Sequence, residues 1–99
     1  MCTSIVEIIA VDGAAKNGAT WFKPTHAVVT YDHPQVALLP DAVCIDFMCE
    51  DSSPGTRAAV ELSLNSAKAL QVALTRVIAE AETEEVETRR PEAAARRAA

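Results

Sequence analysis

The chain has few aromatic and few basic residues. The first shortage limits the kind of core it can form, and the second limits the kinds of partner it can bind. The four aromatic residues are Trp21, Phe22, Tyr31 and Phe47, so a core must be built mainly from Val, Ile, Leu and Ala. Nine Lys and Arg residues face fourteen Asp and Glu residues, for a net charge of −5. This balance argues against nucleic acid or an anionic membrane as the main partner. At 99 residues we expect one small domain, which buries only about 60–65% of its unfolded surface.

Cysteine is also sparse. Cys2, Cys44 and Cys49 make an odd number, and no two of them have the CxxC spacing of a metal or redox motif. The opening residues lack the basic segment and long apolar run of a signal peptide, and no run reaches transmembrane length. These absences favour a cytoplasmic protein with free thiols.

Residues 42–64 read as a β-hairpin around which the rest of the chain is organised. Counted outward from a loop at residues 51–56, one register closes the hairpin with an opposite-charge pair, Glu50 and Arg57. That register also builds one apolar face from the pairs Phe47–Val60, Ile45–Leu62 and Val43–Leu64. On the other face it sets Asp46 opposite Glu61. Two like charges directly opposite each other destabilise a sheet, so this pair invites a functional explanation.

Two more strands precede this hairpin. An apolar, β-branched run spans residues 3–11, and a second strand is expected over about residues 21–31. Asn17-Gly18 between them is a strong signal for a two-residue hairpin turn. With that turn, Val6 pairs with Val29 and Ile8 pairs with Ala27.

A helix should follow the last strand, with Ser63 or Asn65 as its N-cap. Its apolar stripe consists of Ala67, Leu70, Leu74, Val77, Ile78 and Ala81. This stripe can cover the apolar face, with Phe47 and Val60 under Leu70 or Leu74. The predicted fold is therefore α+β: a four-stranded antiparallel meander with one C-terminal helix packed on one face. It forms a single domain over residues 1–88, followed by a mobile Arg/Ala-rich tail over residues 89–99.

The predicted registers place a polar row across the uncovered face of the sheet. It runs over four strands as Glu7, His26, Asp46 and Glu61. Its apolar neighbours are Ile5, Ile9, Val28 and Met48. Two close carboxylates push their pKa values apart and leave one protonated, which suits general acid/base chemistry.

Three functions and one plain structural explanation fit that row. The first is a small-molecule enzyme of acid/base type (a lyase, isomerase or cyclase) that needs no cofactor, with Glu7, His26, Asp46 and Glu61 as catalytic residues. The second is a non-catalytic homodimer that binds a ligand or partner across this face. The third is a protein that binds a divalent metal ion through the same residues. If this face is solvated, the row needs no functional explanation, because two carboxylates about 5 Å apart repel by only about 1 kcal/mol in water.

Two smaller features are weaker candidates. Removal of Met1 would expose Cys2 beside a free α-amine, which can act as base for a side-chain nucleophile. Cysteine is, however, also an ordinary small buried residue. Asp32-His33 before Pro34 could form a polar pair at a pocket rim, although these are common turn residues.

Several local motifs together resemble a known family. They are the opening MCT, Glu7, Trp21-Phe22, Tyr31-Asp32-His33-Pro34, Ile45-Asp46-Phe47 and Val60-Glu61-Leu62 before an Ala/Leu helix. Over about residues 1–81 the chain is similar to an uncharacterised family of short actinobacterial proteins, classed as a domain of unknown function. The resemblance implies a bacterial cytoplasmic protein near natural-product pathways and assigns no catalytic residue. Members of this family often carry a histidine in the loop after the proline, where this chain reads Gln35-Val36-Ala37.

Overall fold

The structure is a computed structural model that describes residues 4–50 and 56–88. By their contacts the residues fall into two units, residues 1–67 and residues 68–99, and each unit is described by itself. The predicted tail at 89–99 lies outside the described residues. The described elements are β1 (Val6–Ala10), β2 (Ala15–Asn17), β3 (Thr20–Phe22), β4 (His26–Asp32), β5 (Ala42–Met48), β6 (Arg57–Leu62) and α1 (Leu64–Thr88).

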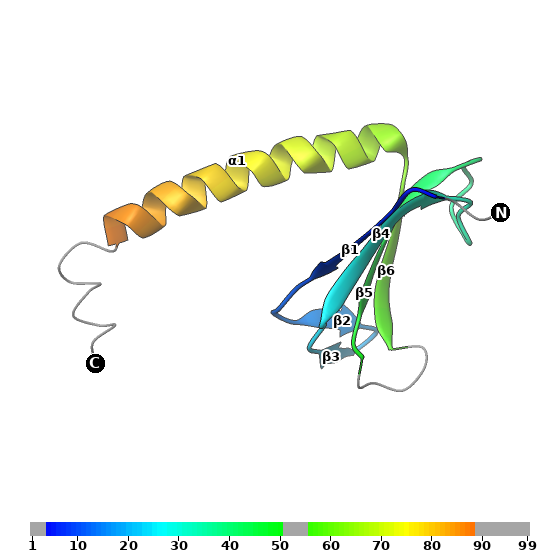
Figure 1. Ribbon diagram of the computed structural model, residues 1–99, viewed down its shortest axis with the longest axis horizontal. Coiled ribbons are helices and arrows are strands. Elements are labelled where there is room, and N and C mark those ends of the chain that lie inside the picture. Colours follow the sequence, from blue (N-terminus) through cyan, green and yellow to red (C-terminus); the bar gives the residue numbers. More distant parts are fainter. Residues whose placement is uncertain (1–3, 51–55, 89–99) are drawn as a thin grey trace. The chain divides into compact units, whose positions relative to one another are not determined.

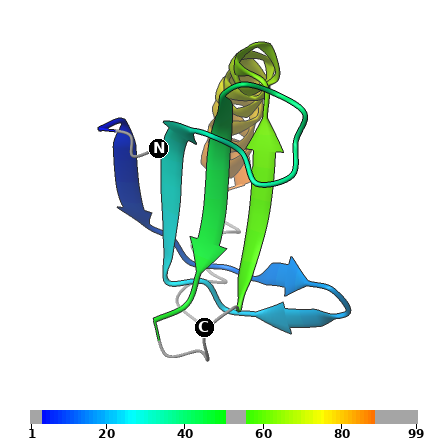
Figure 2. The same ribbon diagram turned by 90° about the vertical axis from the view of Figure 1, so that its right-hand side faces the viewer.

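The first unit is built on a four-stranded antiparallel sheet in the order β1-β4-β5-β6 (Figure 1). This sheet and the C-terminal helix confirm the predicted α+β fold. The sequence did not predict that β2 and β3 form a separate two-stranded sheet, which projects beyond the end of the larger one (Figure 2).

The predicted register of the first strand pair was wrong by one residue. Val6 lies opposite Thr30 rather than Val29, and Ile8 lies opposite Val28 rather than Ala27. Because successive side chains of a strand point to opposite faces, a shift of one residue moves every side chain of β1 to the other face. Glu7 lies opposite Val29, and therefore on the other face from the one that was predicted for it.

An extra residue between β1 and β2, together with a turn one residue further along the chain, produces this shift. Val11 N–H bonds to the Thr25 carbonyl at 3.1 Å, and the next ladder begins with Ala15 opposite Phe22. From residue 11 to 15 is four steps, whereas from 25 back to 22 is three, so the first strand carries a bulge. Gly13 lies within the bulge with φ +122°, a conformation that side chains disfavour.

The turn itself also differs from the prediction. Asn17 pairs with Thr20, so Gly18 and Ala19 form the turn, with Gly18 at φ +62°. Glycine takes this positive φ without steric cost, which explains its position at the first central residue.

The central hairpin was predicted with the correct faces but the wrong partners. Asp46 lies opposite Ala59 rather than Glu61, and Glu61 lies opposite Cys44. The shift of two residues preserves which face each side chain occupies, so the hydrophobic pattern alone could not exclude it. It separates the two carboxylates and replaces the expected Glu50–Arg57 pair by Met48 opposite Arg57.

The ladders define two faces of the sheet. The apolar face carries Glu7, Ile9, Ala27, Val29, Tyr31, Val43, Ile45, Phe47, Ala58, Val60 and Leu62. The mixed face carries Val6, Ile8, Ala10, His26, Val28, Thr30, Asp32, Ala42, Cys44, Asp46, Met48, Arg57, Ala59 and Glu61. Val28 and Met48 are on the mixed face as predicted, whereas Ile9 is not.

The helix α1 begins where the sequence placed it. The Ser63 hydroxyl accepts the N–H of Ser66 at 3.1 Å, so Ser63, one of the two predicted residues, is the N-cap. No helix within the described residues is long and apolar enough to cross a membrane. The predicted contact of Phe47 and Val60 with Leu70 or Leu74 depends on how the two units meet, and it stays a prediction.

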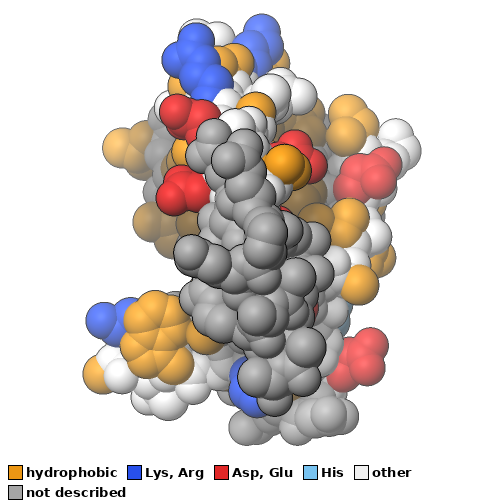
Figure 3. Space-filling model, turned by 90° about the vertical axis from the view of Figure 1, so that its left-hand side faces the viewer, with side chains coloured by type: hydrophobic (Ala, Val, Ile, Leu, Met, Phe, Trp, Pro, Cys, Tyr) orange, Lys and Arg blue, Asp and Glu red, His pale blue; other side chains and the backbone are white. Residues whose placement is uncertain are grey.

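Large hydrophobic side chains are not buried in the described part of the chain. Its buried residues are Pro24, Ala27 and Ala42, all of them small. Hydrophobic side chains are visible at many places on the face that Figure 3 shows. Exposed hydrophobic residues of the sheet include Ile8, at 66%, and Val60, at 43%. A sheet normally buries at least one face against another layer. Taken by itself, the sheet of the first unit therefore has apolar surface that a layer from this chain or from a second copy can cover.

The bulge predicts the effect of a backbone substitution. Gly13→Ala should lower the free energy of unfolding by about 1 kcal/mol, because the left-handed φ strains any residue with a Cβ. No atom lies within 4 Å of the added Cβ, so the cost comes from the backbone alone. Urea unfolding of Gly13→Ala beside Ala14→Ser measures it, and an unchanged stability of Gly13→Ala would contradict the bulge.

Candidate functional site

The four predicted catalytic residues do not form one row. Glu7 lies on the apolar face, whereas His26, Asp46 and Glu61 lie on the mixed face. The carboxylate pair on which the acid/base prediction depended is also absent, because Asp46 faces Val28 and Ala59 on its two neighbouring strands. The extra residue before β2 and the two-residue shift of β6 explain both corrections.

Glu61 holds the loop between β4 and β5. Its carboxylate accepts the backbone N–H of Gln35 at 2.5 Å and those of Val36 and Ala37 at 2.9 Å each. These bonds, led by that of Ala37, lower the pKa of Glu61. Glu61 is therefore not the carboxyl with a raised pKa that an acid/base pair would contain. An ionised carboxylate bound by three amides is a structural anchor and a poor proton donor.

Asp46 and Glu61 are connected through a residue that the sequence analysis did not place in the site. An Arg57 guanidinium nitrogen lies 3.7 Å from Asp46 Oδ2, and the other terminal nitrogen donates to Gln35 Oε1 at 3.2 Å. Gln35 in turn donates its backbone N–H to Glu61. Side chain and backbone thus tie the β4–β5 loop to the start and end of β6.

His26 is held at the opposite end of the sheet. Its Nδ1 lies 3.0 Å from the hydroxyl of Thr25, which also accepts the N–H of Glu50 at 3.1 Å. Asp46, Glu61 and His26 of the predicted row therefore have separate local partners.

Cys44 is the thiol nearest to these groups. It lies on the mixed face, opposite Thr30 and Glu61. Burial raises the pKa of the Cys44 thiol, and the carboxylates of Glu61 and Asp46 raise it further. A thiol that stays protonated at neutral pH is a weak nucleophile. Cys2, the other candidate thiol, lies outside the described residues.

The remaining polar candidates have structural partners. Asp32 Oδ1 accepts the N–H of His33 at 2.7 Å, which is typical of a turn, and His33 Nδ1 lies 4.0 Å from Asp41. Within residues 4–50 and 56–88 no three His, Cys, Asp or Glu side chains are grouped so that they could hold a metal ion.

The apolar face has a hollow at the end of the sheet where β4 finishes and α1 begins. We call it the Tyr31 hollow. It measures about 400 Å³ and is lined by Ile5, Glu7, Val29, Thr30, Tyr31, Val43 and Leu64. All of these residues belong to the first unit. The lining combines aliphatic side chains with one carboxylate and one phenol, the composition expected of a site for a small organic molecule.

A second hollow of about 410 Å³ lies toward the other end of this face, where the β2–β3 hairpin approaches β6. Its lining includes Trp21, Phe47, Ala58 and Val60. Lys16 Nζ lies 6.0 Å from the centre of the Trp21 ring, at the limit of a cation–π contact. Of the two charged residues that line this hollow, Asp12 and Lys16, the lysine thus has an aromatic neighbour.

The sequence model of a family of unknown function, DUF6295, matches residues 1–87. The chain belongs to this family. The match extends past residue 81, where the sequence resemblance was expected to stop, and it confirms that the family is uncharacterised. No curated protein and no solved structure matches the chain.

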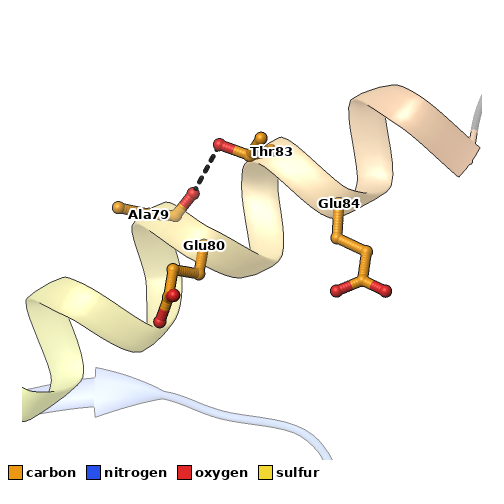
Figure 4. A pocket seen from close by; sticks show the side chains of 4 residues that line it. All are labelled: Ala79, Glu80, Thr83 and Glu84. Atoms are coloured by element: carbon orange, nitrogen blue, oxygen red, sulfur yellow. Dashed lines mark hydrogen bonds between the residues drawn. The ribbon is translucent and has the colours of Figure 1, made fainter.

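The helix of this DUF6295 member carries only a shallow surface feature. It lies between Ala79, Glu80, Thr83 and Glu84, all on one side of α1 (Figure 4). The Thr83 hydroxyl donates to the Ala79 carbonyl at 3.0 Å within the helix. Side chains from a single helix do not enclose a ligand, so the feature suggests no site.

The Tyr31 hollow was missed because its parts were predicted separately. The sequence placed Tyr31, Val29 and Val43 on the apolar face, but the whole face was assigned to the helix. Glu7 was assigned to the other side by the one-residue error. The correct turn alone would not have placed Glu7, because the register of Ala15–Asn17 with Thr20–Phe22, continued to β1, sets Glu7 opposite Thr30 on the mixed face. The extra residue before β2 moves it to the apolar face.

The anchoring role of Glu61 predicts a distinct pH dependence. Its folded pKa is lowered, so the stability that it contributes is fully present above the ordinary value of 4.5 and is lost as the pH falls through the folded pKa. Glu61→Gln should lower the melting temperature at neutral pH, and the difference from the native protein should close on acidification. Hydrogen exchange at Gln35, Val36 and Ala37 should accelerate in the same variant.

Glu50→Gln is the matched control, because it removes one negative charge from an exposed residue at the far end of β5. Equal effects of the two substitutions across the pH range would show that the loop bonds do not stabilise the protein.

Proposed function

We propose that the protein is a non-catalytic homodimer that binds a small, mainly apolar molecule in the Tyr31 hollow. The observation that carries the proposal is a preformed concavity on the apolar face with two polar groups at known positions. Such hollows, of roughly 300–1,000 Å³ with a few polar groups, are the usual form of small-molecule sites.

The lining supports binding and gives no support to a chemical step. Val29 pairs with Ile45, and the next pair on the same face is Tyr31 with Val43. Val29 and Val43 are therefore diagonal neighbours on adjacent strands. Both contribute aliphatic surface to the hollow, from the two central strands β4 and β5. Glu7 stands on the edge strand β1 and Leu64 at the start of α1, so the walls come from different elements. Glu7 and Tyr31 are the titratable residues of this lining. They stand on different strands, β1 and β4, and no hydrogen bond joins them among the described residues.

Homodimer formation is supported by the apolar surface of so short a chain. The buried residues of the described part are small, and large hydrophobic side chains are exposed on both faces of the sheet and along α1. On α1 the exposed fractions are 40% for Leu70, 51% for Leu74 and 52% for Ile78. Isolated sheets of this size need a covered face for stability, and a second copy can supply part of that cover.

The acid/base enzyme hypothesis has less support. A lyase, isomerase or cyclase acting through Glu7, His26, Asp46 and Glu61 would need these groups to converge, and they occupy two faces. A divalent metal site on the mixed face would need a ligand group that the described residues do not form. Ligand binding without chemistry requires neither.

The cellular setting of this proposal is the bacterial cytoplasm, in an actinobacterium and near natural-product metabolism, as the sequence resemblance implies. Cys44 and Cys49 are both free thiols, which fits a reducing compartment. A small apolar molecule is a suitable ligand in that setting.

Binding can be tested with the neutral dye Nile red. Val29→Thr keeps the side-chain shape but places a hydroxyl in the hollow, so we expect dye affinity to fall about five-fold. Val28→Thr makes the same change one residue away, on the mixed face, and should leave affinity unchanged. Fluorescence titration measures both, with circular dichroism to verify folding. Equal losses in the two variants, or no dye binding by the folded native protein, would reject this site.

The oligomeric state gives an independent test. Static light scattering should return about twice the chain mass of 10.5 kDa over a wide concentration range, because the exposed apolar surface favours association. A mass near 10.5 kDa throughout that range would reject the homodimer.

A further inference from the structure

We infer that the Tyr31 hollow selects a small organic cation: an amine or other positively charged group attached to an aromatic or branched aliphatic body. This inference rests on the proposed function, because it names the class of ligand that the hollow would take. Three observations lead to it: where Glu7 lies, what partners it has, and what surrounds it.

The position of Glu7 is fixed by the β1–β4 ladder. It pairs with Val29, whose side chain lines the hollow, and Glu7 lies on the same face. The register of the ladder sets the face on which this residue lies, because side chains alternate between the two faces along a strand. A carboxylate that is exposed to solvent therefore lines a hollow made mainly of aliphatic residues.

Glu7 has no partner within the protein among residues 4–50 and 56–88. The described salt bridges are Arg57–Asp46 and His33–Asp41, and no described hydrogen bond involves the Glu7 side chain. Basic residues are also absent from the lining: Arg57 lies on the mixed face, and Lys16 lines the other hollow. The contrast with Glu61, which has three donors, is direct.

The surroundings of Glu7 favour a cation with an apolar body. Val29, Val43 and Leu64 offer aliphatic contact, and the ring of Tyr31 can stack on a flat group or on the cation itself. An anionic ligand would meet repulsion from Glu7 and from a chain of net charge −5. A neutral apolar ligand would fit the lining but leave the carboxylate without a partner beneath it.

Three probes with the same ring system separate these cases. They are 1-naphthylmethylamine, which is protonated at neutral pH, its neutral alcohol 1-naphthylmethanol, and the anion 1-naphthoate. In the full-length native protein we expect the amine to bind about five-fold more tightly than the alcohol at low salt, with the anion weakest. The preference should shrink as the ionic strength rises.

The variants identify the group responsible. Glu7→Gln should abolish the preference for the amine and leave the affinity for the alcohol unchanged. Glu50→Gln makes the same change in net charge outside the hollow and should retain the preference. Chemical-shift changes of Val29, Tyr31 and Val43 during each NMR titration locate the bound probe.

The possible outcomes test the cation selectivity and the proposed function separately. Equal binding of amine and alcohol at the hollow overturns the cation selectivity and keeps the proposed function. A preference that persists in Glu7→Gln, or disappears equally in Glu50→Gln, shows a general charge effect and overturns the role of Glu7. No shift at the hollow with any probe overturns both proposals.

Discussion

A single extra residue between β1 and β2 decides which face of the sheet carries Glu7. The antiparallel ladder has a period of two, so one inserted residue reverses every side chain of β1 relative to β4. Without the bulge at Gly13, the register of β2 and β3 continued to β1 would set the carboxylate opposite Thr30 on the mixed face. With it, the carboxylate lies in an apolar hollow, and the acidic groups of the two faces are separated.

Glu61 illustrates how a residue that looks catalytic becomes structural. A carboxylate flanked by apolar positions in a strand is costly unless its charge is compensated. Here the compensation comes from three consecutive backbone amides of the β4–β5 loop, with Arg57 nearby. The same bonds satisfy amides that a loop would otherwise leave to water, so the strand and the loop stabilise each other. Perturbed pKa values are therefore ambiguous evidence of function, since anchors produce them as readily as active sites do.

The sheet has well-defined ladders and little core of its own. Its buried side chains are small, and its larger aliphatic residues remain partly exposed among the described residues. Hydrogen bonding between strands defines the geometry of the hollows, whereas the hydrophobic effect must be completed by association or by ligand. This division is the physical reason for which we propose ligand binding and dimer formation.

The sequence by itself determined where most strands and the helix form and, for three strands of the sheet, which face each side chain occupies. Alternation of apolar and polar residues correctly assigned the faces of β4, β5 and β6, and Ser63 correctly marked the start of α1. These features depend on local periodicity and on contacts between near neighbours in the chain. The tertiary structure alone decided the partner of each residue. The predicted β5–β6 register was wrong by two residues, because such a shift leaves the apolar pattern intact. The predicted β1–β4 register was wrong by one, because a bulge leaves only a weak signal in the sequence. The donors to Glu61 lie 24–26 residues away in a loop, and no local pattern encodes contacts over that separation.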